Sequence, residues 1–295
     1  MTPAQATGAA ERPLLRADAA VQAVDELRLE LVDLLPGENS EAGLGRRPRM
    51  GHDLGAMLGR SRAVVAEARL RLRRDLPGGA AGFGVGAQLL QGLARLVEIV
   101  PDADTAAIED EFSGAGALLE PGAGDVLWPA DTCPDNAVLD GDGWWFLDLE
   151  ATDVAHAALA AAYTVLPFAS CWCVFDPPPG LTDELLAAFT TGLAAYAPEV
   201  VEAPEWRRQV SIACAAYVVL NTAWFIDSAI EGRPSVGPAG RSPTYRQLVA
   251  SRWRWGALAL RGDFPALAAA LRDAAVWSSR TWGFDAETTG YRAFH

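Results

Sequence analysis

Two polar stretches near the middle of the chain combine residue types that could transfer a phosphoryl group. Asp131 and Asn136 lie five residues apart, and Asp148 follows an apolar segment and the turn Gly141-Asp142-Gly143. If the segments on either side of this turn pair as strands, these three side chains come to lie at one end of a hairpin. Phosphoryl transfer from a nucleotide needs a carboxylate near the acceptor hydroxyl, together with an amide and a carboxylate that hold the metal ions. Asp131, Asn136 and Asp148 therefore form the candidate site.

Residues 126–150 resemble the catalytic and metal-binding loops of the aminoglycoside phosphotransferase and choline kinase-like enzymes, which are relatives of the protein kinases. The pattern of that family reads His-Gly-Asp, four residues, Asn, and then a hairpin that ends in Asp-Phe-Glu or a similar triplet. The resemblance implies that Asp131 is the catalytic residue, which orients or deprotonates the acceptor. It also implies that Asn136 and Asp148 bind the cofactors as magnesium ligands, and that the γ-phosphoryl group of ATP passes to a small-molecule hydroxyl.

Three departures from the family pattern bear on catalysis. Pro129-Ala130 stands where the family has His-Gly, and Ala160 stands about where a buried Asp anchors the catalytic loop from the next helix. The chain contains no lysine, since all 24 of its Lys and Arg residues are Arg. The lysine that grips phosphate in this family therefore has no counterpart, and arginine replaces a compact ammonium poorly. We expect a phosphotransferase whose reaction is weakened or lost.

The alternative is a non-catalytic, pseudokinase-like module that binds a small molecule or a partner protein through the same cleft, and a purely structural helical scaffold is a third possibility. The net charge of −14 and the pI near 4.6 argue against nucleic-acid binding, which needs a positive surface. An acidic chain suits a cytoplasmic protein and a cationic small-molecule substrate of the aminoglycoside or choline type. The first 13 residues lack the basic start and apolar core of a secretory signal.

The pattern of apolar residues predicts a mainly α (α+β) fold, similar to the helical C-terminal lobe of the kinase-like family with one small β-hairpin unit. Residues 1–50 are predicted to form a helix and a loop, too short for the family's N-terminal sheet lobe, and residues 51–295 to form the helical domain. Either the gene encodes half of a kinase, or an upstream portion is missing from the sequence. Helices are predicted at residues 14–35, 52–74, 87–99, 105–112, 155–166, 182–197, 205–230, 243–259 and 264–280.

Several other residues and segments are better explained by a structural role than by a role in catalysis or binding. Residues 210–226 are the most apolar stretch, but their polar interruptions favour a buried helix at the centre of a bundle over a membrane span. The four cysteines lack the paired spacing of a zinc site and are expected to be free thiols. His156 is expected to hold a loop by one hydrogen bond. Most of the ten tryptophans are expected in the core, with Trp172 and Trp224 as cleft-lining exceptions.

Glycine-rich, acidic and leucine-rich segments also have structural explanations. The glycine-rich residues 82–86 follow no buried strand, which favours a simple loop over a nucleotide-binding turn. Acidic residues at 109–111 and 183–184 fit solvated helix faces at least as well as a site for a polyamine. Residues 14–35 carry more leucines than one amphipathic face requires, and we expect this segment to cover the exposed top of the helical lobe in preference to a symmetric dimer contact.

Overall fold

Helices dominate the computed structural model, which describes residues 47–62, 85–118, 122–128, 131–132, 136–139, 144–146, 153–166, 180–234 and 243–283. This confirms the prediction of a mainly α fold. The helices are α2 (Arg47–Ser61), α4 (Val85–Ile99), α5 (Thr105–Glu111), α6 (Ala157–Val165), α7 (Leu181–Ala194), α8 (Pro198–Val201), α9 (Trp206–Ile230), α10 (Tyr245–Ala259) and α11 (Pro265–Trp282), with a 3₁₀ turn at Ala115–Leu118.

Within the described ranges, four short strands form two separate antiparallel pairs. Strand β1 (Asp125–Trp128) pairs with β4 (Asp153–His156), and β2 (Ala137–Leu139) pairs with β3 (Trp144–Phe146). The second pair is the hairpin that the sequence predicts around residues 141–143. The first pair was not predicted, because its two strands lie far apart in the sequence and only the fold brings them together.

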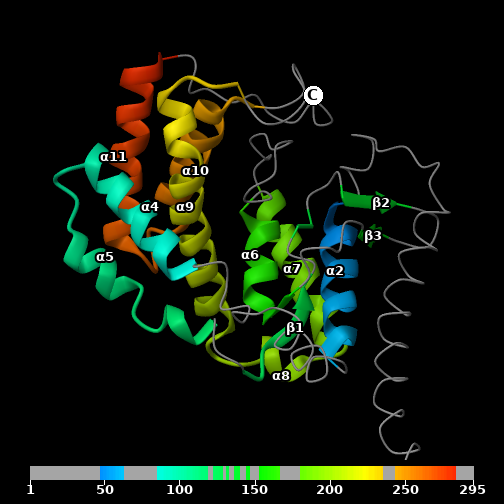
Figure 1. Ribbon diagram of the computed structural model, residues 1–295. Coiled ribbons are helices and arrows are strands. Elements are labelled where there is room, and N and C mark those ends of the chain that lie inside the picture. Colours follow the sequence, from blue (N-terminus) through cyan, green and yellow to red (C-terminus); the bar gives the residue numbers. More distant parts are fainter. Residues whose placement is uncertain are drawn as a thin grey trace, which may run out of the picture.

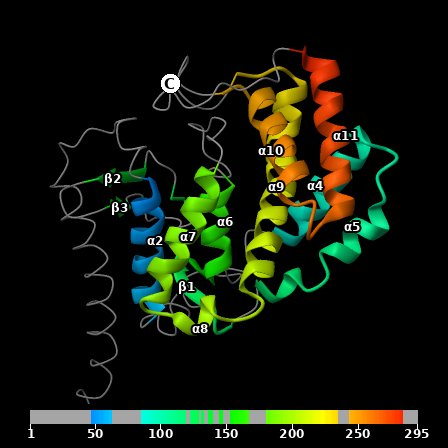
Figure 2. The same cartoon turned by 180° about the vertical axis from the view of Figure 1, so that it is seen from behind.

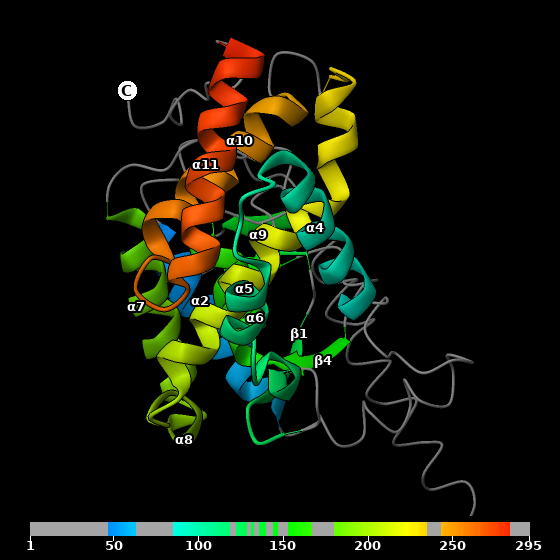
Figure 3. The same cartoon turned by 90° about the vertical axis from the view of Figure 1, so that its left-hand side faces the viewer.

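The helices form two groups that meet along α9 and α6. Figure 1 shows α4, α5, α10 and α11 around α9 on one side, and α2, α7 and α8 with the strands beside α6 on the other. The reverse view in Figure 2 shows the same division, and in the side view of Figure 3 the group around α9 lies in front of α2, α6 and α7.

Helix α9 forms the centre of the bundle, as predicted for residues 205–230. By length and composition it could cross a membrane, but 67% of its most apolar 18-residue stretch is buried inside the protein. Gly92 of α4 permits a close approach, because a Cβ at this position would lie 2.2 Å from the carbonyl oxygen of Val219. The indole of Trp253 on α10 donates a hydrogen bond to Thr222 Oγ1 (2.9 Å), so the few polar groups of α9 are used for packing.

Two helix boundaries differ from the prediction for clear physical reasons. The predicted helix 182–197 ends at Ala194, and a new short helix begins at Pro198, whose ring cannot continue the preceding helix. The predicted helix 155–166 begins at Ala157, because Ala155 pairs with Val126 in the β1–β4 ladder. The helix predicted at 52–74 begins at Arg47, and its predicted residues after position 62 lie outside the described part of the chain.

The closest contact between helices joins α2 and α7. Gly51, Gly55 and Gly59 recur every four residues on α2 and therefore lie on one face. A Cβ at Gly55 would lie 2.2 Å from the carbonyl oxygen of Phe189, and a Cβ at Gly192 of α7 would lie 2.0 Å from that of His52. Real Cβ atoms do not approach an oxygen so closely, so these positions admit only glycine.

We predict that Gly55→Ala destabilises the protein by about 2 kcal/mol or more, because the added methyl group must push the two helix backbones apart. The matched control is Gly86→Ala on α4, where a Cβ would meet nothing within 4 Å. This control should leave stability unchanged or raise it by up to about 1 kcal/mol, as expected for alanine in a helix. Urea denaturation of the three proteins measures both effects, and equal stability of the two variants would contradict the close packing.

Candidate functional site

The candidate site lies on the segment that joins the two strand pairs. Strand β1 ends at Trp128 and β2 begins at Ala137, so the intervening loop carries Asp131 at its middle and Asn136 at its end. The antiparallel ladder that pairs Asp125 with His156 and Trp128 with Asp153 fixes where the loop begins. The pairing of Ala137 with Phe146 fixes where it ends.

Asp131 and Asn136 are brought together by a hydrogen bond across the loop. Asn136 Nδ2 donates to the backbone carbonyl oxygen of Asp131, at 3.4 Å. Both residues are half-buried, and Thr132 between them is fully buried. Two of the three predicted site residues therefore lie together, while Asp148 lies outside the described residues, as do Pro129 and Ala130.

Tyr163 of α6 holds the Asp131 carboxylate, a contact that was not predicted. Its hydroxyl group donates to Asp131 Oδ1 at 2.8 Å. Ala160, where the family has an anchoring Asp, lies one helical turn earlier and is fully buried. Residues three apart lie on the same helix face, so the longer side chain of Tyr163 reaches the loop from the next turn. The sequence carried only a general signal, since a buried tyrosine usually places its hydroxyl on a polar partner but the residue type does not indicate which one.

The ring of Tyr163 is fixed between aromatic side chains from two other elements. Trp128 of β1 lies edge-on to it, with ring centroids 6.5 Å apart. Tyr217 of α9 lies edge-on at 5.8 Å. Burial raises the pKa of Tyr217 well above its usual range, with smaller contributions from Cys214 and Asp131. Tyr217 thus stays protonated and neutral beside the candidate carboxylate.

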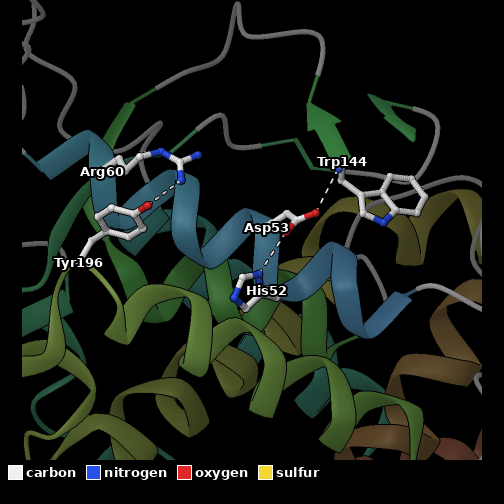
Figure 4. A network of polar contacts seen from close by, with 5 residues as sticks. All are labelled: His52, Asp53, Arg60, Trp144 and Tyr196. Atoms are coloured by element: carbon white, nitrogen blue, oxygen red, sulfur yellow. Dashed lines mark hydrogen bonds and ion pairs between the residues drawn. The ribbon is translucent and has the colours of Figure 1, made fainter. Parts of the chain in front are cut away.

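Helix α2 supports both strand pairs through side chains of its own, and Figure 4 shows the contact of Asp53 with Trp144. Near its start, Asp53 Oδ2 accepts a hydrogen bond from the backbone N–H of Trp144 on β3 (3.1 Å), and Asp53 Oδ1 lies 3.1 Å from His52 Nδ1. At its end, Ser61 Oγ accepts from the backbone N–H of Leu127 on β1 (2.9 Å). One helix therefore sets the position of the strands that bracket the loop.

His156 joins β4 to α6 and plays the structural part that the sequence predicted for it. It is the N-cap of α6, and its Nδ1 accepts a hydrogen bond from the backbone N–H of Ala158 (3.1 Å), which places its proton on Nε2. A Cβ at Gly124 would lie only 2.0 Å from Nε2, so the ring packs directly on the backbone before β1. Burial lowers the pKa of His156, and the Asp125 carboxylate offsets part of this effect.

Three buried polar atoms around the loop have no hydrogen-bond partner among the described residues. They are Trp128 Nε1, Thr132 Oγ1 and Trp144 Nε1. An unmade hydrogen bond of this kind costs about 1–3 kcal/mol for each buried group. Such atoms are not confined to this region, since Arg95 Nε of α4 and Asn221 Oδ1 of α9 also lack a partner among the described residues.

The remaining candidate residues fall into structural roles where the structure describes them. Glu111 caps α11, because its carboxylate accepts from the backbone N–H groups of Ala266 (2.6 Å) and Leu267 (3.0 Å). Cys214 is a free thiol, and burial raises its pKa to about 12. Trp224 is 40% exposed and donates to Gln88 Oε1 (2.6 Å) on the α4 side of α9.

The other predictions concern segments outside the described residues. These are the helix at 14–35, residues 82–84 of the glycine-rich segment, Trp172 and the cysteines at 133, 171 and 173, whereas Val85 and Gly86 form the first turn of α4. Among the residues that the structure describes, no group of three or more His, Cys, Asp or Glu side chains could hold a metal ion.

No protein-family model matches the sequence, and no curated protein is significantly similar to it. The resemblance to the aminoglycoside phosphotransferase and choline kinase-like enzymes therefore stays a prediction that rests on residues 120–175.

We predict that the folded protein loses stability as the pH falls below the ordinary His156 pKa of 6.5. The unfolded chain then binds a proton that the buried ring resists, so stability is present above this pH and declines below it, by at most about 1.4 kcal/mol per pH unit. The control is His156→Asn, which keeps a capping oxygen without a titrating ring. Urea denaturation between pH 5 and 8 should show a steeper decline for the native protein, whereas parallel curves would contradict the assignment.

Proposed function

We propose that the unit from β1 to α6 is a phosphoryl-transfer site of the aminoglycoside phosphotransferase and choline kinase type. Its reaction is the transfer of the ATP γ-phosphoryl group to a hydroxyl of a small, cationic molecule. The observation that carries the proposal is the pairing of Asp131 with Asn136. These two residues keep the spacing of the family pattern, and a hydrogen bond joins them across the loop.

Asp131 is the residue that acts on the acceptor. Its half-buried carboxylate is positioned by Tyr163 and lies on a loop whose two ends are fixed by strand pairs. A carboxylate in hydrogen-bond reach of a substrate hydroxyl orients that hydroxyl and accepts its proton as the phosphoryl group is transferred. Loops between fixed elements are where such groups are commonly found.

Asn136 suits the role of a magnesium ligand, with Asp148 as the second ligand by resemblance. The amide nitrogen of Asn136 donates to the backbone carbonyl oxygen of Asp131, so this hydrogen bond does not use the amide oxygen of Asn136. Magnesium prefers oxygen ligands and is held by one or two protein side chains together with substrate phosphates, so a three-residue cluster is not required. When bound, the ion neutralises charge on the phosphates.

One observation favours the alternative of a non-catalytic, pseudokinase-like binding module. The 295 residues contain no lysine, so no ammonium group can pair with the nucleotide phosphates. Arginine is larger and more weakly hydrated, and its planar fork of donors does not reproduce a point charge. In this alternative, the loop with Asp131 and Asn136 is retained as a binding surface for a small molecule or a partner protein.

The test of catalysis is transfer of labelled phosphate from magnesium-ATP to a panel of aminoglycosides and choline. If the native protein phosphorylates a member of the panel, Asp131→Asn should lower kcat by about 10²- to 10⁴-fold, because the variant cannot accept the proton. The matched control is Asp183→Asn, the same change at an exposed acid of α7. Full activity of Asp131→Asn would remove this residue from the reaction.

Nucleotide affinity separates the active enzyme from the binding module. Without a lysine on the phosphates, we expect magnesium-ATP to bind with a Kd of about 1 mM or weaker, which corresponds to about 4 kcal/mol. Isothermal titration calorimetry of the 295-residue chain measures this constant. A micromolar Kd would show that arginines or other groups replace the lysine, and would argue against the pseudokinase alternative.

A further inference from the structure

We propose that Tyr163 is a positioning residue for Asp131, and that it takes over the anchoring role which the family gives to a buried Asp on the same helix. This inference deepens the proposed function and rests on it. Its basis is the hydrogen bond from the Tyr163 hydroxyl to Asp131 Oδ1, at 2.8 Å. The family position for the anchor is Ala160, which is fully buried and has no polar side chain.

The tyrosine is held rigidly enough to fix the orientation of another side chain. Its side chain is almost entirely buried, and Trp128 and Tyr217 contact its ring edge-on from β1 and from α9. These three residues come from elements that are far apart in the sequence, so the ring cannot move without disturbing the bundle. The hydroxyl therefore occupies one place relative to the loop.

The contact restricts the rotation of the Asp131 carboxylate about its terminal torsion. The terminal torsion of an aspartate is broad, so a carboxylate without a partner samples many orientations. A hydrogen bond on Oδ1 narrows this range and presents the carboxylate to the acceptor in one orientation. Misplacement of a reacting group by about 1 Å can cost about 100-fold in rate, which makes such a constraint valuable for catalysis.

The replacement also changes the electrostatics of the loop. An aspartate at position 160 would place a second carboxylate near Asp131, and two neighbouring carboxylates disfavour each other's ionised form. A tyrosine hydroxyl is a neutral donor and adds no charge to the loop. Tyr163 can therefore anchor Asp131 directly, in a protein that already carries a net charge of −14.

A double-mutant cycle tests the contact without any assumption about activity. The variants are Tyr163→Phe, Asp131→Ala and the combination of both, compared by urea denaturation. Tyr163→Phe keeps the ring and removes only the hydroxyl, so it should fold. A hydrogen bond between the two side chains predicts non-additive effects, with a coupling of about five- to tenfold in the unfolding equilibrium constant. Additive effects would overturn the proposal, whatever the protein catalyses.

The positioning role is tested by kinetics with magnesium-ATP and the acceptor found in the transfer assay. Tyr163→Phe should lower kcat by about 10- to 100-fold and leave KM for both substrates unchanged, because orientation matters in the transition state and not in binding. In an Asp131→Asn background, Tyr163→Phe should cause no further loss. The control is Tyr245→Phe, which removes a hydroxyl from a partly buried ring of α10 that packs against Phe225.

The outcomes separate the two proposals. Coupling in the denaturation cycle with an unchanged kcat for Tyr163→Phe would make the contact purely structural and overturn the positioning role alone. A rise in KM that accompanies the fall in kcat would assign Tyr163 to substrate binding, and this result would also overturn the positioning role. If the native protein transfers no phosphate to any acceptor, the proposed function fails, and the positioning role fails with it even where the cycle confirms the contact.

Discussion

The close approach of α2 to α7 is the contact on which the position of the candidate site depends. Glycines on both helices let the backbones touch, as the distances at Gly55 and Gly192 show. From the same helix, Asp53 and Ser61 reach the backbones of β3 and β1. A wider separation would withdraw both side chains from the strands, and the loop with Asp131 and Asn136 would lose the supports at its two ends.

The candidate loop combines a well-anchored carboxylate with buried polar atoms that have no partner among the described residues. Asp131 is tightly held by Tyr163, while nearby buried atoms such as Thr132 Oγ1 lack a partner in the described part of the chain. Elsewhere the bundle uses its polar groups for packing, as Trp253 does with Thr222 and Glu111 with the start of α11. Such atoms are not confined to the loop, however, since Asn221 Oδ1 of α9 and Arg95 Nε of α4 also lack a partner among the described residues.

The proposed function rests on a small unit within a large helical scaffold. A fold alone does not define chemistry, which depends on what the individual side chains do. Asp131 and Asn136 supply the carboxylate and the amide that phosphoryl transfer requires, and the absence of lysine is the strongest reason to expect a weak or lost reaction. The acidic balance of the chain suits a cationic ligand under either function.

The sequence by itself determined the helices, because apolar periodicity acts locally and reports which face will be buried. It predicted α9 and the β2–β3 hairpin closely, and it singled out Asp131 and Asn136 by residue type and spacing. It could not predict the β1–β4 ladder or the anchor of Asp131 by Tyr163. Both join residues about 30 positions apart, and such contacts arise from packing that no local pattern encodes. The support that α2 gives to the strands also depended on the tertiary structure. Its glycines mark a face suited to close packing, but the sequence does not indicate which helix packs there.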